Sequence, residues 1–117
     1  MAAVNVLSSS TLMGTDVKNP AGEDLGDIEE LMIDLDAGRV AYAVLSFGGI
    51  AGIGDKLFAI PWQAMTVDTA NEQVVIDIDK ETLDEAPGFD KSNWPETADY
   101  TWLGEVYEYY GYTPYWR

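Results

Sequence analysis

The sequence has no cysteine and no histidine, and only six of its 117 residues are lysine or arginine. These absences exclude disulfides, thiol nucleophiles, Cys/His zinc sites and the histidine proton shuttle common in enzymes. Long apolar runs are missing too: the longest nearly uncharged stretch, residues 40–54, holds four glycines and is too short for a spanning helix. We therefore expect no catalytic site, no cofactor and no membrane insertion.

Acidic residues dominate the charge. There are 21 of them, and the net charge is −15. Such a charge repels phosphate backbones and anionic lipids, so we expect no direct nucleic-acid partner. It favours solubility, a basic protein partner or life at high salt, and the charge alone does not separate these three. The N-terminal residues lack the basic and apolar parts of a signal peptide, so we expect a cytoplasmic protein.

The length and the 47% hydrophobic content fit one globular domain. We expect a loose lead-in over residues 1–11, a β-barrel over residues 12–79 and a helical, aromatic-rich extension over residues 80–117. Apolar alternation and turn residues predict a mainly β fold of about six strands, at residues 12–18, 25–36, 40–47, 56–60, 65–68 and 73–78.

Local patterns refine these strands. Asn19–Gly22 predicts a type I turn, and a bulge is expected between Gly26 and Glu30. Beyond it, Leu31, Ile33 and Leu35 should share one face, with Asp34 and Asp36 on the other. The strand Val40–Phe47 is apolar on both faces, which indicates that both are covered.

The last third of the chain changes character. Asp79 is placed to cap a short helix that ends near Ala86, and a second helix is expected from Asp99 to Tyr110, with Gly111 as its stop. Nine of the 14 aromatic residues lie from Trp94 onward. Two interpretations of this tail stay open: it seals the barrel of its own chain, or it meets another chain.

Four segments together resemble the PRC-barrel signature: Gly14–Val17, Gly22–Ile28, Met32–Leu45 and Lys56–Met65. The resemblance implies a small, partly open β-barrel. The family occurs in the cytoplasmic part of the photosynthetic reaction-centre H subunit, at the C-terminus of a ribosome-maturation factor and as free-standing bacterial and archaeal proteins. The present sequence is most similar to the free-standing type. The resemblance supplies no catalytic residues, and it does not extend to the aromatic tail.

The glycine-rich segment Gly48–Lys56 invites a phosphate-loop interpretation. However, Asp55 stands where such a loop needs lysine, and a strand follows in place of a helix. A simple connection between strands explains the glycines better. Ile50 and Ile53 in this segment are candidate apolar contacts for a partner.

Two acidic pairs, Asp34 with Asp36 and Asp77 with Asp79, are the candidate ligands for a divalent ion such as calcium. The first pair imitates the start of a calcium loop, but Leu45 falls where the loop needs its bidentate glutamate. Solvated strand edges that resist pairing with another sheet are the alternative explanation. We therefore expect no metal site.

These observations predict a non-catalytic protein-binding or assembly module that self-associates as a dimer or larger oligomer. Its contact surfaces would be the apolar strand Val40–Phe47, the glycine segment and the aromatic tail. The candidate partner-binding residues are Ile50, Ile53, Tyr107, Tyr110, Tyr112, Tyr115 and Trp116. The alternatives are a small-molecule or calcium sensor and an enzyme of unknown reaction.

Overall fold

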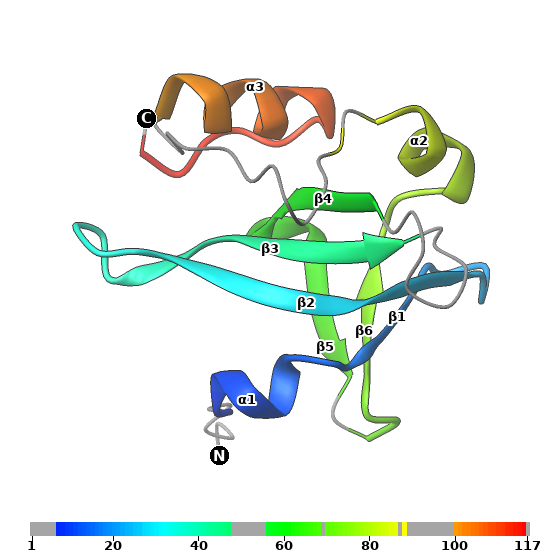
Figure 1. Ribbon diagram of the computed structural model, residues 1–117. Helices are drawn as coiled ribbons and strands as arrows, with labels where there is room; N and C mark the ends of the chain where they lie inside the picture. Colours follow the sequence, from blue (N-terminus) through cyan, green and yellow to red (C-terminus); the bar gives the residue numbers. More distant parts are fainter. Residues whose placement is uncertain (1–6, 48–55, 69, 87, 89–99, 117) are drawn as a thin grey trace, which may run out of the picture.

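The computed structural model describes residues 7–47, 56–68, 70–86, 88 and 100–116. Six strands form one curled sheet in the order β4-β3-β2-β1-β6-β5 (Figure 1). They are β1 (Asp16–Lys18), β2 (Asp24–Asp34), β3 (Arg39–Phe47), β4 (Lys56–Pro61), β5 (Met65–Asp68) and β6 (Gln73–Ile76). All neighbours are antiparallel except β1 and β6, which are parallel. The predicted mainly β, partly open architecture is confirmed.

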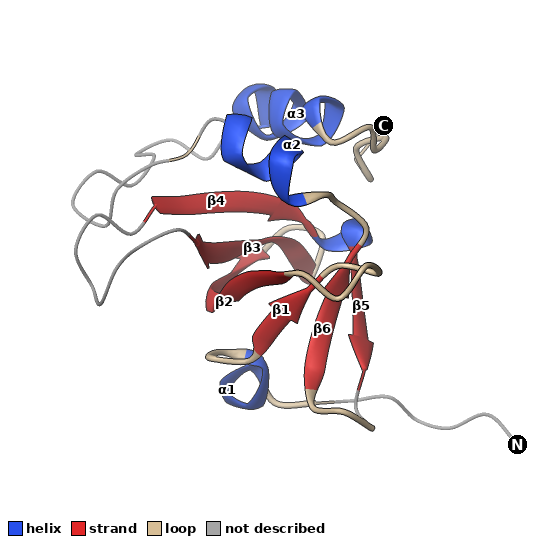
Figure 2. Ribbon diagram, turned by 90° about the vertical axis from the view of Figure 1, so that its right-hand side faces the viewer, coloured by secondary structure: helices blue, strands red, loops and turns tan. Residues whose placement is uncertain are grey.

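Short helices complete the fold. They are α1 (Ser9–Leu12), the 3-10 helix η1 (Trp62–Ala64), α2 (Lys80–Glu85) and α3 (Tyr100–Tyr109). Figures 1 and 2 both place α2 and α3 near β4, which forms one edge of the sheet. The structure differs from the prediction at the N-terminal end, where the first strand was expected to begin at residue 12. Residues 9–12 form α1, where Ser8 accepts a hydrogen bond from the Thr11 amide, and the first strand begins only at Asp16.

β2 shifts its register with β3 twice, first between Ile28 and Glu30 and again between Met32 and Ile33. The first shift confirms the predicted bulge. The second was not predicted; its extra residue is Ala41 of β3, since Met32 pairs with Tyr42 and Ile33 with Val40. Leu31 packs against the core, whereas Leu35 lies in the turn after β2 and is 89% exposed, so the predicted shared face does not extend to Leu35.

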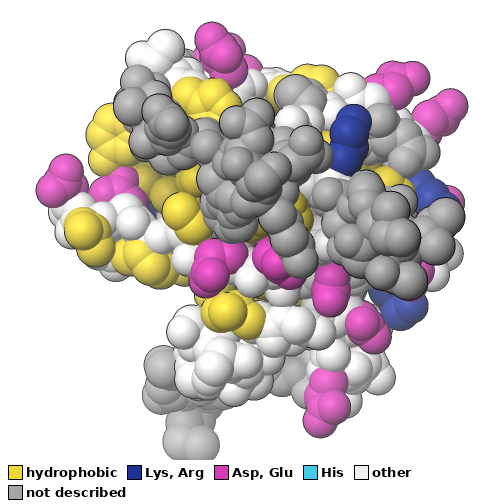
Figure 3. Space-filling view, in the orientation of Figure 1, with side chains coloured by type: hydrophobic (Ala, Val, Ile, Leu, Met, Phe, Trp, Pro, Cys, Tyr) yellow, Lys and Arg dark blue, Asp and Glu magenta, His cyan; other side chains and the backbone are white. Residues whose placement is uncertain are grey.

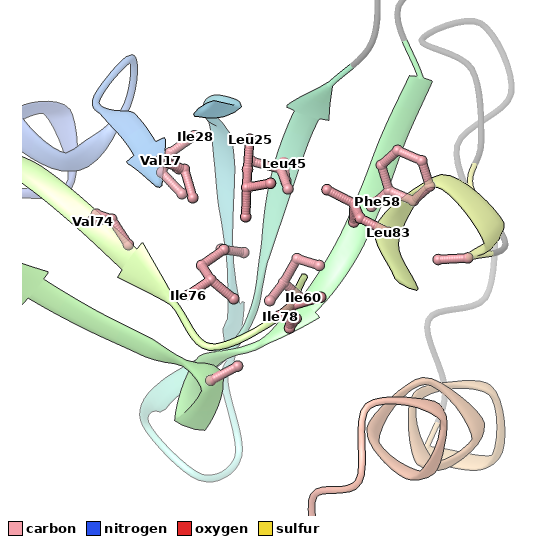
Figure 4. Packing of buried hydrophobic residues seen from close by; sticks show 13 residues of the cluster. Val17, Leu25, Ile28, Leu45, Phe58, Ile60, Val74, Ile76, Ile78 and Leu83 are labelled. Carbon is pink, nitrogen blue, oxygen red and sulfur yellow. The ribbon is translucent and has the colours of Figure 1, made fainter. Parts of the chain in front are cut away.

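β3 and β4 are buried on both faces of the sheet. Residues 41–45 and 57–61 are all buried. On the concave side, Leu45, Phe58 and Ile60 belong to the main core (Figure 4). On the other side, Val44 packs in a second cluster with Tyr107 of α3. The predicted covering of strand Val40–Phe47 is confirmed, and helix α3 of the same chain supplies the outer cover.

α2 belongs to the barrel core, although the sequence placed it in a separate extension. The Asp79 side chain accepts a hydrogen bond of 2.7 Å from the Thr82 amide, which confirms the predicted cap. Leu83 and Ala86 lie in the same cluster as Phe58, and Figure 4 shows Leu83 beside Phe58. The core that the barrel strands enclose is therefore complete only at Ala86.

Candidate binding site

A groove of about 350 Å³ lies between the β2–β3 hairpin and the first turn of α3. We call it the hairpin groove. Its walls are formed by Met32, Ile33, Asp34, Leu35, Asp36, Ala41, Tyr42, Tyr100 and Leu103. In the view of Figure 3, apolar side chains gather at the left, where the hairpin lies, with carboxylates beside them.

The rim of the groove carries the most exposed large apolar side chains of the described residues. Leu35 is 89% exposed, Ile33 is 53% exposed and Tyr100 is 44% exposed. Single exposed leucines are common, but a contiguous apolar patch beside a groove is typical of a contact surface. A second hollow, near α1, is bordered by Leu7, which is 41% exposed. The hairpin groove is therefore the stronger candidate for binding.

Asp34 connects the hairpin turn to the C-terminal part of the chain. Its Oδ1 accepts hydrogen bonds of 3.0 Å from the amides of Asp36 and Ala37. Its Oδ2 accepts one of 2.7 Å from the Tyr100 hydroxyl and another from the Tyr115 hydroxyl. These bonds, that of Tyr115 foremost, lower the pKa of Asp34 to about 2, because they stabilise the charged form. The hairpin turn is thus organised around the negatively charged carboxylate of Asp34.

Tyr115 and Trp116 form what we call the C-terminal clasp. The guanidinium carbon of Arg39 lies 4.0 Å from the centroid of the Tyr115 ring, in a cation–π contact. The Trp116 ring stacks on Tyr100 with centroids 4.6 Å apart and planes at 19°. Burial, and after it the hydrogen bond to Asp34, raises the pKa of Tyr115 above its ordinary value. The clasp therefore contacts both the hairpin and α3.

The predicted partner-binding residues of the tail are mostly turned toward their own chain. Tyr107 is fully buried, and its hydroxyl donates a 2.5 Å hydrogen bond to the Ala41 carbonyl, so the prediction that it meets a partner was wrong. Tyr110 and Tyr112 are partly buried and pack against the core. Burial holds the pKa of Tyr110 well above its usual range. Most of the tail therefore fits the first of the two interpretations, in which it packs on the barrel of its own chain.

The other predicted site residues are dispersed. Ile50 and Ile53 lie outside the described residues. Asp34 has both carboxylate oxygens engaged as described, and Asp79 caps α2. Asp36 and Asp77 are exposed. Within the described ranges, no three acidic side chains come together in a way that could hold a metal ion.

Sequence reasoning did not single out Ile33, Leu35 and Tyr100 as candidate binding residues. Leu35 is exposed because it lies in the turn after β2. The place of Tyr100 beside the hairpin depends on the position of α3, which has no local signal in the sequence. The alternation of apolar and acidic residues from Ile33 to Asp36 was visible, but it equally suits an ordinary half-buried strand.

None of the helices in the described part of the chain is long and apolar enough to cross a membrane.

The model of the PRC-barrel domain family matches residues 5–83. No curated protein matches the chain. The matched segment contains all six strands and the β2–β3 hairpin, and it ends inside α2. The α3 wall of the hairpin groove and the C-terminal clasp therefore lie beyond the family domain, so these two features are additions to it.

Proposed function

The chain belongs to the PRC-barrel family, and from this we propose that it is a non-catalytic protein-binding module. Its contact surface is the hairpin groove, and its occupant is a segment of another protein that carries both apolar and basic side chains. PRC-barrel domains are in general non-catalytic.

The observation that carries the proposal is the exposure of Leu35 and Ile33, at 89% and 53%, on the rim of a groove. Burying an exposed leucine or isoleucine side chain stabilises a complex by roughly 1.5–3 kcal/mol. A partner that places apolar side chains in the groove would bury both of these residues and the ring of Tyr100. Aromatic rings are common at such contacts.

Charge supports a basic occupant. Asp34 and Asp36 line the groove, and the chain as a whole has a net charge of −15. Lysine or arginine side chains beside the apolar anchors of a partner would face these carboxylates. The negative electrostatic field of the chain would also speed its association with such a partner. A second copy of the chain would instead bring the same carboxylates to the contact, where like charges repel.

The self-association predicted from the sequence has fewer surfaces to use. Strand Val40–Phe47 is covered by the chain itself, and Tyr107 is buried. Residues 48–55 of the glycine segment lie outside the described residues. A homo-oligomer that forms through the hairpin groove is the competing proposal, and the experiment below separates the two.

The test uses a short fluorescent peptide in which lysine and leucine alternate, titrated with the full chain and followed by anisotropy. We expect saturable binding that weakens as salt is added. Replacing Leu35→Ser should weaken it about tenfold, because one apolar anchor is lost. Leu7→Ser, at an exposed leucine outside the groove, is the matched control and should bind as the wild type.

Two results contradict the proposal. One is equal binding of a peptide in which glutamate replaces lysine, since the carboxylates would then play no part. The other is a wild-type dimer in light scattering that Leu35→Ser converts to a monomer, which would assign the groove to self-association.

A further inference from the structure

We infer that Tyr115 and Trp116 are positioning residues of the hairpin groove. They fix the groove residues Asp34 and Tyr100 in the arrangement that a partner binds. The inference rests on the proposed function, since it concerns the same groove. Neither Tyr115 nor Trp116 lines the groove, so each acts through the residue that it holds.

Tyr115 acts on Asp34. Its hydroxyl donates to Oδ2 of Asp34, the oxygen that also accepts from Tyr100. The ring is in turn held under the Arg39 guanidinium, at 4.0 Å from centroid to carbon. Arg39 and Asp34 are register partners across the hairpin. Seating Tyr115 therefore fixes the groove carboxylate together with the last residue pair before the hairpin turn.

Trp116 acts on Tyr100. The two rings are nearly parallel, with centroids 4.6 Å apart, in the stacked arrangement that stabilises aromatic pairs. Tyr100 begins α3, is 44% exposed and forms one wall of the groove. Without the stack this ring loses one of the two contacts described for it, the other being its hydrogen bond to Asp34, so a partner has to order it further on binding.

Because Asp34 and Tyr100 line the groove and also contact the clasp, binding of a partner in the groove and seating of the clasp affect each other. A seated clasp presents an ordered groove, so binding costs less conformational entropy. The coupling is reciprocal: a partner in the groove must stabilise the seated clasp by the same free energy.

A simpler explanation is that the clasp only seals the core, since the Trp116 ring also lies 5.4 Å from that of buried Tyr107. The variant Tyr115→Phe separates the two explanations. It keeps the ring under Arg39 and removes only the hydroxyl that reaches Asp34. Trp116→Leu keeps an apolar side chain at the position and removes the stack on Tyr100. Tyr112→Phe, at a tail tyrosine packed on the core, is the matched control.

The first measurement needs no partner. Carbon NMR of the carboxyl groups follows the titration of Asp34 in the free full-length chain. In Tyr115→Phe the pKa of Asp34 should rise from about 2 toward 3.8, and in Tyr112→Phe it should not change. In Trp116→Leu the ring resonances of Tyr100 should shift, while those of Tyr109 stay in place.

The second measurement uses the lysine–leucine peptide of the preceding section. We expect Tyr115→Phe and Trp116→Leu each to weaken its binding by roughly fivefold or more, and the peptide to shift the indole N–H resonance of Trp116 in the wild type. Unchanged affinity in both variants overturns the inference and leaves the proposed function standing. Failure of the wild type to bind overturns the proposed function. An Asp34 titration that does not move in Tyr115→Phe overturns the positioning role in either case.

Discussion

The Tyr115 hydroxyl donates a hydrogen bond to the Asp34 carboxylate, joining two residues that lie 81 positions apart. Through this contact the tail of the chain closes on the turn of the β2–β3 hairpin. The same carboxylate accepts the two backbone amides that shape the turn. Asp34 is therefore a residue of the family domain on which the C-terminal addition depends.

Acid should weaken this contact. The folded-state pKa of Asp34 is lowered from 3.8 to about 2, so its contribution to stability is fully present above pH 3.8 and is lost as the pH falls through about 2. The replacement Asp34→Asn should lower the melting temperature at neutral pH. The difference from the wild type should shrink over that acid window, as followed by circular dichroism. A difference that stays constant across the window would contradict the assignment.

Gly26→Ala should be strongly destabilising. Gly26 has a φ of +105°, and a Cβ there would lie 1.9 Å from the Ser46 carbonyl oxygen of the neighbouring strand. We expect a loss of roughly 2–4 kcal/mol in the free energy of unfolding, measured with urea. Gly22→Ala is the control: Gly22 also has a positive φ, but an added Cβ meets nothing within 4 Å, so about 1 kcal/mol is expected. Equal losses would show that the contact with Ser46 is unimportant.

Removing the Tyr107 hydroxyl tests how α3 is fixed to β3. The hydroxyl is buried and donates to the Ala41 carbonyl at 2.5 Å. Tyr107→Phe should lower the free energy of unfolding by about 1–2 kcal/mol, because a buried hydrogen bond is lost. Tyr109→Phe removes a hydroxyl from an exposed position, where it bonds the Thr82 carbonyl at 3.1 Å, and should cost less than about 0.5 kcal/mol. A larger loss for Tyr109→Phe than for Tyr107→Phe would contradict the packing of α3 on β3 through the Tyr107 hydroxyl.

The same substitution at two leucines tests whether α2 belongs to the core. Leu83 is 1% exposed and Leu35 is 89% exposed. Leu83→Ala should cost about 2–4 kcal/mol, through the lost burial and the cavity left behind. Leu35→Ala should stay within about 0.5 kcal/mol of the wild type. A small effect at Leu83, measured by urea unfolding, would instead support a barrel that is complete without α2.

Much of the fold was predictable because its signals are local. The turn at Asn19–Gly22 forms, with the Gly22 amide 2.9 Å from the Asn19 carbonyl oxygen. Val74 and Ile76 alternate and are buried as predicted, and Gly111 follows α3 with a φ of +83°. Each of these features follows from a few neighbouring residues.

The candidate site was not predictable in the same way. Leu35 is exposed because β2 ends at Asp34 and Leu35 already lies in the turn, whereas the alternation of apolar residues predicted a strand up to Asp36. The partners of Asp34 lie 66 and 81 positions away, so its carboxylate looked like a free surface group or a calcium ligand. The tail aromatics left two interpretations open, and only the packing of Tyr107 shows which describes it.

The most direct test of the binding account is a methyl NMR titration of the full chain with the lysine–leucine peptide. The account predicts shifts of the methyl resonances of Met32, Ile33, Leu35 and Leu103, all of which line the hairpin groove. Leu7, Leu12 and Val67, which border the hollow near α1, should not move. Shifts confined to this second set, or no saturable shifts at all, would contradict the assignment of the hairpin groove as the binding surface.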